Sequence, residues 1–152
     1  MRRLSGFLVA GAIMLLPAFS QVAFAQQAPQ KTTFTGDVVI WAFNVNADKA
    51  ADYEAVVAKL KDALSKSEAP EAKQQLAGWK VMKNAAPQPD GSLVYTHVIA
   101  PVVPDADYSI TNIVYASMKD PTEQRAFYDQ YRGAVKAVLF LIQGPLTADL
   151  SK

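Results

Sequence analysis

One stretch, Val38–Val45, sets the fold class of this chain, with the sequence Val-Val-Ile-Trp-Ala-Phe-Asn-Val. Its residues are β-branched or aromatic except for Ala42 and Asn44, which predicts a β-strand. Apolar and polar residues do not alternate along it, so we expect both faces of the strand to be covered. Because successive side chains of a strand point to opposite faces, Trp41 and Asn44 are expected on different faces.

The segments that follow this strand predict a helix and then a β-hairpin. Apolar residues recur at three- and four-residue steps over residues 46–66, which is typical of an amphipathic helix. A second short helix is predicted over residues 71–77, before Gly78. Strands are predicted at residues 79–83 and 93–100, joined by a turn that contains Pro89-Asp90-Gly91.

A second helical region and a last strand complete the pattern. We expect helices from Asp105 or Asp107 to about Met118, and from Asp120-Pro121 onward, since aspartate caps helices and proline favours their first position. Residues 138–142, Val-Leu-Phe-Leu-Ile, predict the final strand. The order is that of a ferredoxin-like βαββαβ domain of the α+β class: a four-stranded antiparallel sheet with helices on one face.

The other face of that sheet needs a cover. Two helices cover one face, yet residues 38–45 and 138–142 are apolar on both. An exposed apolar patch of that size is unusual for a monomer, and a second copy of the chain, packed sheet to sheet, would hide it. The sequence therefore predicts a homodimer.

The first 25 residues have the pattern of a secretory signal peptide. Arg2 and Arg3 precede a 13-residue run, Phe7–Phe19, that only Gly11 and Pro17 interrupt, and Ala23-Phe24-Ala25 fits the signal peptidase rule. The run is shorter than the roughly 20 residues that span a bilayer, so a retained anchor is the weaker alternative. We expect cleavage, export to the periplasm or the medium, and no membrane association afterwards.

Cleavage would leave a flexible lead-in, residues 26–35, and a single domain, residues 36–152. Loss of both arginines leaves 13 basic against 14 acidic residues, which gives no reason to expect nucleic acid as a partner. The chain contains no cysteine, so an exported domain would be held together without disulfides.

The layout of residues 36–150, with Leu76-Ala77-Gly78-Trp79 opening the hairpin, resembles the dimeric α/β-barrel superfamily, which includes antibiotic-biosynthesis-monooxygenase-like domains. The resemblance implies a range of activities: cofactor-free monooxygenases, haem-degrading enzymes, isomerases and proteins without known activity. Some haem-degrading members combine an asparagine, a tryptophan and a histidine. Their histidine lies on a helix, whereas His97 is predicted on a strand, so no haem or other cofactor is expected.

His97 is the only histidine and the one candidate catalytic residue, as a general base. The alternative is an inert histidine at a sheet or dimer interface. One histidine and no cysteine also argue against a metal site. The expected ligand-binding residues are the following: Trp41, Asn44, Tyr95, His97 and Tyr115.

Three functional hypotheses follow from the sequence. The first is an exported homodimer that binds a small apolar or aromatic molecule, because the strands are rich in aromatic residues and no catalytic motif is found. The second is a cofactor-independent monooxygenase or isomerase that uses His97 and a nearby tyrosine. The third is an exported structural domain without a ligand.

Overall fold

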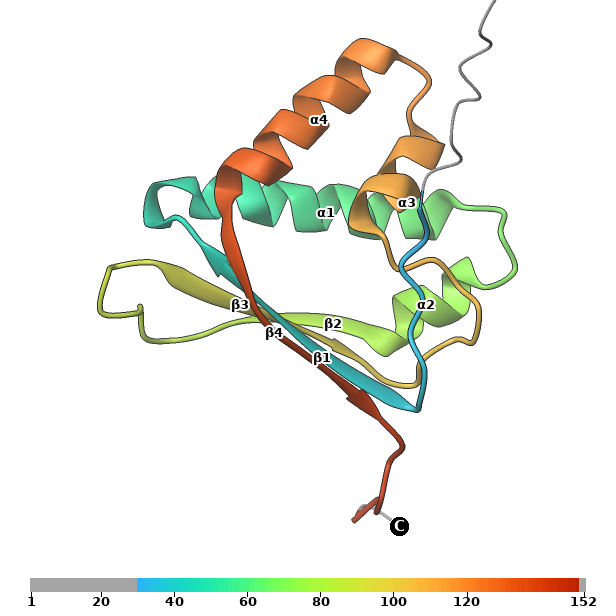
Figure 1. The fold of residues 1–152 in the computed structure, drawn as a ribbon. Helices are drawn as coiled ribbons and strands as arrows, with labels where there is room; N and C mark the ends of the chain where they lie inside the picture. The colour runs from blue at the N-terminus through green and yellow to red at the C-terminus, as the bar shows by residue number, and fades with distance from the viewer. Residues whose placement is uncertain (1–29, 151–152) are drawn as a thin grey trace, which may run out of the picture.

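The computed structural model describes residues 30–150 as an α+β domain built on a four-stranded antiparallel sheet (Figure 1). The predicted signal peptide and residues 26–29 lie outside the described residues. The elements in chain order are β1 (Val38–Val45), the 3-10 helix η1 (Ala47–Lys49), α1 (Ala50–Lys66), α2 (Ala72–Gly78), β2 (Trp79–Lys83), β3 (Leu93–Ile99), α3 (Ile110–Ser117), α4 (Pro121–Ala134) and β4 (Val135–Gly144).

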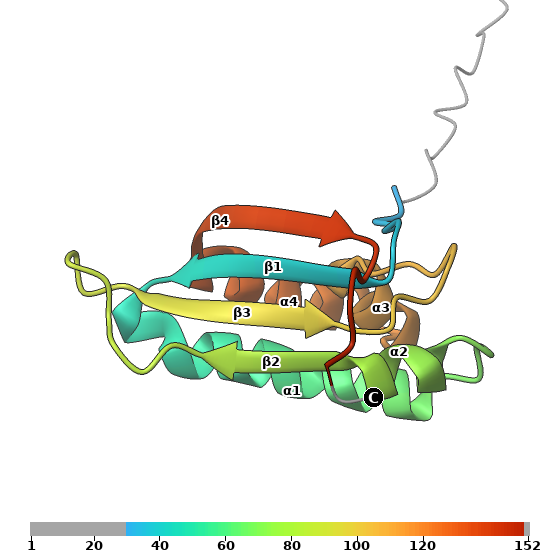
Figure 2. The ribbon, with the colours of Figure 1, turned by 90° about the horizontal axis from the view of Figure 1, so that it is seen from below.

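The strands are arranged in the order β2-β3-β1-β4, with every neighbouring pair antiparallel. β1 is therefore central, while β2 and β4 are the two edges. The long helices α1 and α4 lie on one side of the sheet, behind it in the view of Figure 2. The hairpin of β2 and β3 is confirmed, with Val81 opposite His97.

The helix side of the sheet carries the core. Phe43 and Val45 of β1 and Tyr95 of β3 pack with Tyr53 and Val56 of α1, and all five are buried. These strand residues are odd-numbered, as the period of two requires for side chains that share a face. α1 buries Leu60 and Leu64 on the same stripe, so the helix docks along its apolar face.

β4 is longer than the predicted strand and far more exposed than β1. The side chains of residues 138–142 are all between 41% and 60% exposed. Phe140 pairs with Ala42, on the outer side of the sheet, and Leu141 pairs with Trp41, on the helix side. The apolar surface of β4 is therefore open on both sides of the sheet, not on the outer side alone.

The third helix begins later than predicted. α3 starts at Ile110, and the hydroxyl of Ser109 accepts a hydrogen bond from the Asn112 amide as its cap. Asp107 instead accepts hydrogen bonds from the amides of Ser109 and Thr32, which organises the turn before the helix. The predicted start of α4 is confirmed, with Asp120 as cap and a proline in the first turn.

Part of the expected lead-in packs on the domain. Thr32 exchanges hydrogen bonds with Asp107 and Tyr108, and the Phe34 ring is buried beside Val39 and Tyr108. Residues 30–35 therefore differ from the expected mobile segment because they close one end of the core. None of the helices within residues 30–150 has the length and apolar character needed to cross a bilayer.

Candidate functional site

The His97 side chain lies at the centre of the helix side of the sheet and has no exposed surface. Its Nε2 lies 2.8 Å from the hydroxyl oxygen of Tyr53, on α1. Its Nδ1 accepts a hydrogen bond of 3.0 Å from the indole Nε1 of Trp79, at the start of β2. Three elements thus hold the ring, and both of its nitrogens are occupied.

These partners fix the protonation of the ring. An indole N–H only donates, so Nδ1 of His97 carries no proton. The neutral ring then has its proton on Nε2 and donates it to Tyr53. Burial lowers the pKa of His97 from 6.5 to about 4 and raises the pKa of the Tyr53 phenol well above its ordinary value.

Charging His97 would place a second proton on Nδ1, against the Trp79 N–H. The site therefore holds a neutral imidazole at neutral pH, with no lone pair free to accept a proton from a substrate. A general base needs such a lone pair within reach of the proton that it removes. In this arrangement His97 joins β3 to α1 and β2 rather than presenting a base.

Aromatic rings fill the space around His97. The rings of Phe43, Trp79 and Trp41 lie 5.0, 5.8 and 6.3 Å from it, centroid to centroid. Tyr53 packs in turn on Tyr95 at 4.8 Å. Such tilted and edge-on pairs are the arrangements that aromatic rings prefer in cores. His97 and its neighbours thus form a packed cluster.

The structure does not bring the other predicted ligand-binding residues into one site. Tyr95 is buried on the helix side, where its hydroxyl donates to Glu54 at 2.7 Å. Asn44 lies on the opposite side of the sheet from Trp41 and His97, as its register shows. The predicted placement of Trp41 and Asn44 on different faces of the strand is therefore confirmed.

Asn44 has a buried polar atom without a partner. Among the described residues, its Oδ1 is the one buried side-chain oxygen or nitrogen that forms no hydrogen bond. Asn44 pairs with Ala137, next to Lys136, which forms an ion pair of 2.6 Å with Asp90 of the β2–β3 loop. The ion pair thus connects the β2–β3 loop to β4 next to the residue that pairs with Asn44.

The fifth predicted residue, Tyr115, lines a shallow open depression of about 620 Å³ at the start of α4. Its ring contacts Phe127 edge-on, with centroids 6.1 Å apart. The rest of the lining is mixed: Pro121, Thr122, Gln124, Arg125, Tyr128 and Asp129. A wide, partly polar depression of this kind encloses little of a small molecule.

A second, more enclosed pocket of about 360 Å³ lies between α1, α2 and β2. Its lining is apolar apart from one lysine and consists of Val57, Leu60, Lys61, Leu64, Leu76, Trp79 and Val81. The volume falls within the range of small-molecule sites. We did not expect this pocket from the sequence, although the α1 residues follow i, i+3, i+4, i+7 spacing along one helix face.

Trp79 connects this pocket with the His97 cluster. Its ring lines the pocket, while its Nε1 donates to Nδ1 of His97. The hydrogen bond holds the indole in one orientation, so one wall of the pocket is fixed before any ligand arrives. Trp41, Tyr95 and His97 line neither this pocket nor the depression at Tyr115.

Within residues 30–150, no three histidine, cysteine or carboxylate side chains gather as metal ligands would. The chain matches no family model, no curated protein and no solved structure.

Proposed function

We propose that the protein is an exported homodimer whose subunits each bind a small apolar molecule in the pocket between α1, α2 and β2. The observation that carries the proposal is the pocket itself, which three elements line with six apolar side chains and one lysine. Binding sites for small molecules are concave, mostly apolar and largely preformed. The hydrogen bond from Trp79 to His97 supplies the preformed wall.

The homodimer is supported by β4. Its five apolar side chains at residues 138–142 remain exposed, and its outer edge has no neighbouring strand. Ile40 of β1, which pairs with Ile142, continues the apolar surface across the outer side of the sheet. Exposed edge strands of this composition pair with another chain or aggregate, so a soluble protein has to cover them.

A ferredoxin-like arrangement and membership of the dimeric α/β-barrel superfamily are part of the same proposal. The antiparallel order β2-β3-β1-β4, with α1 and α2 between β1 and β2, supports the arrangement. Export rests on the sequence of residues 1–25. A fold alone does not identify a function, so the class of ligand is inferred from the side chains that line the pocket.

The pocket favours binding over catalysis. The competing hypothesis needs His97 as a base beside a cavity, but both of its nitrogens are occupied and rings surround it. The pocket instead presents aliphatic side chains, one indole ring and one exposed lysine, and its apolar side chains contact a ligand without reacting with it.

Native mass spectrometry of the protein purified from its own host tests the proposal. We expect a dimer with a retained small molecule, at up to one copy per subunit. Filling the pocket with Val57→Trp should remove the ligand and leave the dimer intact, since Val57 is far from β4 in the chain and on another element. A wild-type protein that carries no small molecule would contradict the proposal, and so would a Val57→Trp variant that retains the molecule as wild type does.

A further inference from the structure

We infer that the ligand of the α1–α2–β2 pocket is an amphiphile with an anionic headgroup, which Lys61 recognises at the rim. This inference rests on the proposed function and specifies its ligand. It starts from the contrast within the lining, where six side chains are apolar and Lys61 alone is charged.

Lys61 lies where a headgroup would be. It follows Leu60 on α1, and it is exposed although it lines the pocket. A lysine in such a place packs its methylene stem on apolar surface and keeps its ammonium in water. The pocket thus has an apolar interior and a positively charged rim.

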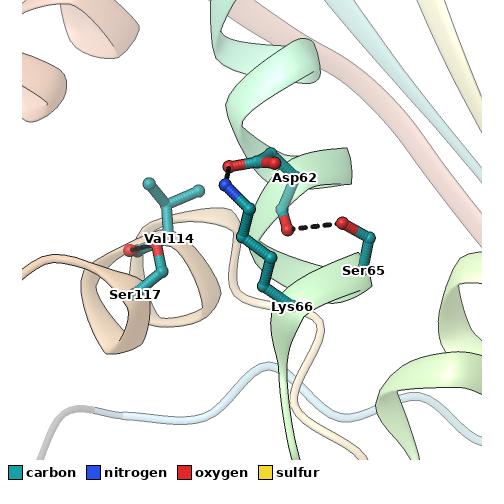
Figure 3. Close-up of polar contacts among 5 residues, drawn as sticks. All are labelled: Asp62, Ser65, Lys66, Val114 and Ser117. Atoms are coloured by element: carbon teal, nitrogen blue, oxygen red, sulfur yellow. Dashed lines mark hydrogen bonds and ion pairs between the residues drawn. The ribbon is translucent and has the colours of Figure 1, made fainter.

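The acidic side chains of α1 do not neutralise Lys61. Asp62 pairs with Lys66 at 2.8 Å and also accepts, through its backbone oxygen, from Ser65 (Figure 3). Asp52 pairs with Lys49, one turn before it.

The third acid of the helix is also engaged. Glu54 accepts hydrogen bonds from the Tyr95 hydroxyl and from Lys83, and together they hold the pKa of its carboxyl below the usual range. Among residues 30–150, Lys61 itself forms no ion pair or hydrogen bond. An anion at the pocket therefore meets an available cation whose neighbouring carboxylates already have partners.

The rest of the pocket fits a hydrocarbon chain. Leu60 and Leu64 are almost fully buried at its base, and Trp79 forms a fixed wall. Among the lining side chains, only the ammonium of Lys61 and the engaged indole N–H of Trp79 carry polar hydrogens. A polar group is therefore accommodated at the rim and not within.

Calorimetric titration of the purified protein with decanoate and with decanol tests the inference, because the two probes share a chain and differ in headgroup charge. We expect decanoate to bind about fivefold more tightly than decanol. Lys61→Ala should remove this difference by weakening decanoate alone. Lys80→Ala, an exposed lysine on the neighbouring strand outside the pocket lining, is the matched control and should preserve it.

The outcomes separate the inference from the proposed function. If both probes bind wild type and Lys61→Ala with equal affinity, the headgroup inference is wrong and the apolar pocket stands. If neither probe binds, or if Val57→Trp leaves binding unchanged, the proposed function itself fails. Should Val57→Trp not fold, Leu76→Trp fills the same pocket from α2 and gives the same decision; thermal unfolding of each variant shows which is usable.

Discussion

β1 and β4 are neighbouring strands with similar apolar sequences and different surroundings. Phe43 of β1 is 1% exposed, whereas Phe140 of β4 is 46% exposed. β1 lies between β3 and β4 under α1, while β4 has a neighbour on one side only. A run of apolar residues therefore indicates that a strand is buried. It does not indicate whether the same chain or a second chain buries it.

The largest expected effect contrasts the two phenylalanines. Phe43→Ala should lower the free energy of unfolding by about 3–5 kcal/mol, because it leaves a cavity among buried rings. Phe140→Ala should cost less than about 1 kcal/mol in the isolated subunit, because the ring is half exposed there. Denaturant unfolding at a protein concentration below the dissociation constant of the dimer measures both changes in the free energy of unfolding. Equal losses of stability in the two variants would contradict the contrast.

The second prediction concerns the cover of β4. Replacing Phe140 and Ile142 together by glutamate should weaken dimerisation by at least about 30-fold, since charges would be placed in an apolar interface. Native mass spectrometry over a dilution series measures the change. Tyr128→Glu, an exposed aromatic position on α4, is the control and should leave the dimer unchanged. A dimer that tolerates both charges on β4 would place the interface elsewhere.

The third prediction concerns the protonation of His97, which lies on β3 opposite Trp41 of the buried strand β1. Because burial lowers the pKa of His97 to about 4, the unfolded chain binds the proton first as the pH falls below about 6.5. Stability should therefore drop between pH 6.5 and 4. Between pH 7 and 4.5, wild type should lose about 2 kcal/mol more unfolding free energy than His97→Gln, which lacks the titrating ring.

Urea unfolding of both proteins at the two pH values gives this difference directly. The carboxylates titrate alike in the two proteins, so subtraction removes their contribution. The same pH dependence with and without His97 would mean that the ring is not held neutral by its surroundings.

The smallest expected effect concerns the start of β4. Lys136→Ala removes the ion pair with Asp90, whose carboxyl pKa this lysine holds well below its ordinary value. Both side chains are half exposed, so the stability of the fold should not change measurably. Amide exchange should become faster in the β2–β3 loop, residues 84–92, and stay the same in β1. Unchanged exchange in the loop would show that the ion pair does not restrain it.

Local sequence patterns predicted most of the fold. The bounds of β1 and β2 are those expected, because they depend on nearby residues. The predicted start of α3 was wrong, because the Asp107 carboxylate accepts a hydrogen bond from the amide of Thr32, which is far away in the chain. Such a contact has no local signal.

The candidate site was harder to predict. Alternation along β3 requires His97 and Tyr95, which are two residues apart, to share a face, as the structure has them. It does not reveal that Trp79 and Tyr53 would occupy both nitrogens of the ring, since these residues come from other elements. The α1–α2–β2 pocket arises where α2 meets the sheet edge, and only the α1 side of its lining follows a sequence period.

The oligomeric mass of the wild-type protein tests the central claim, that a second copy covers β4. Sedimentation velocity of the protein without residues 1–25, at micromolar concentration, measures it. We predict a dimer that dissociates on dilution. The combined substitutions Phe140→Glu and Ile142→Glu should leave a monomer at the same concentration. A monomer at that concentration, with the amides of β4 protected from exchange, would contradict the account.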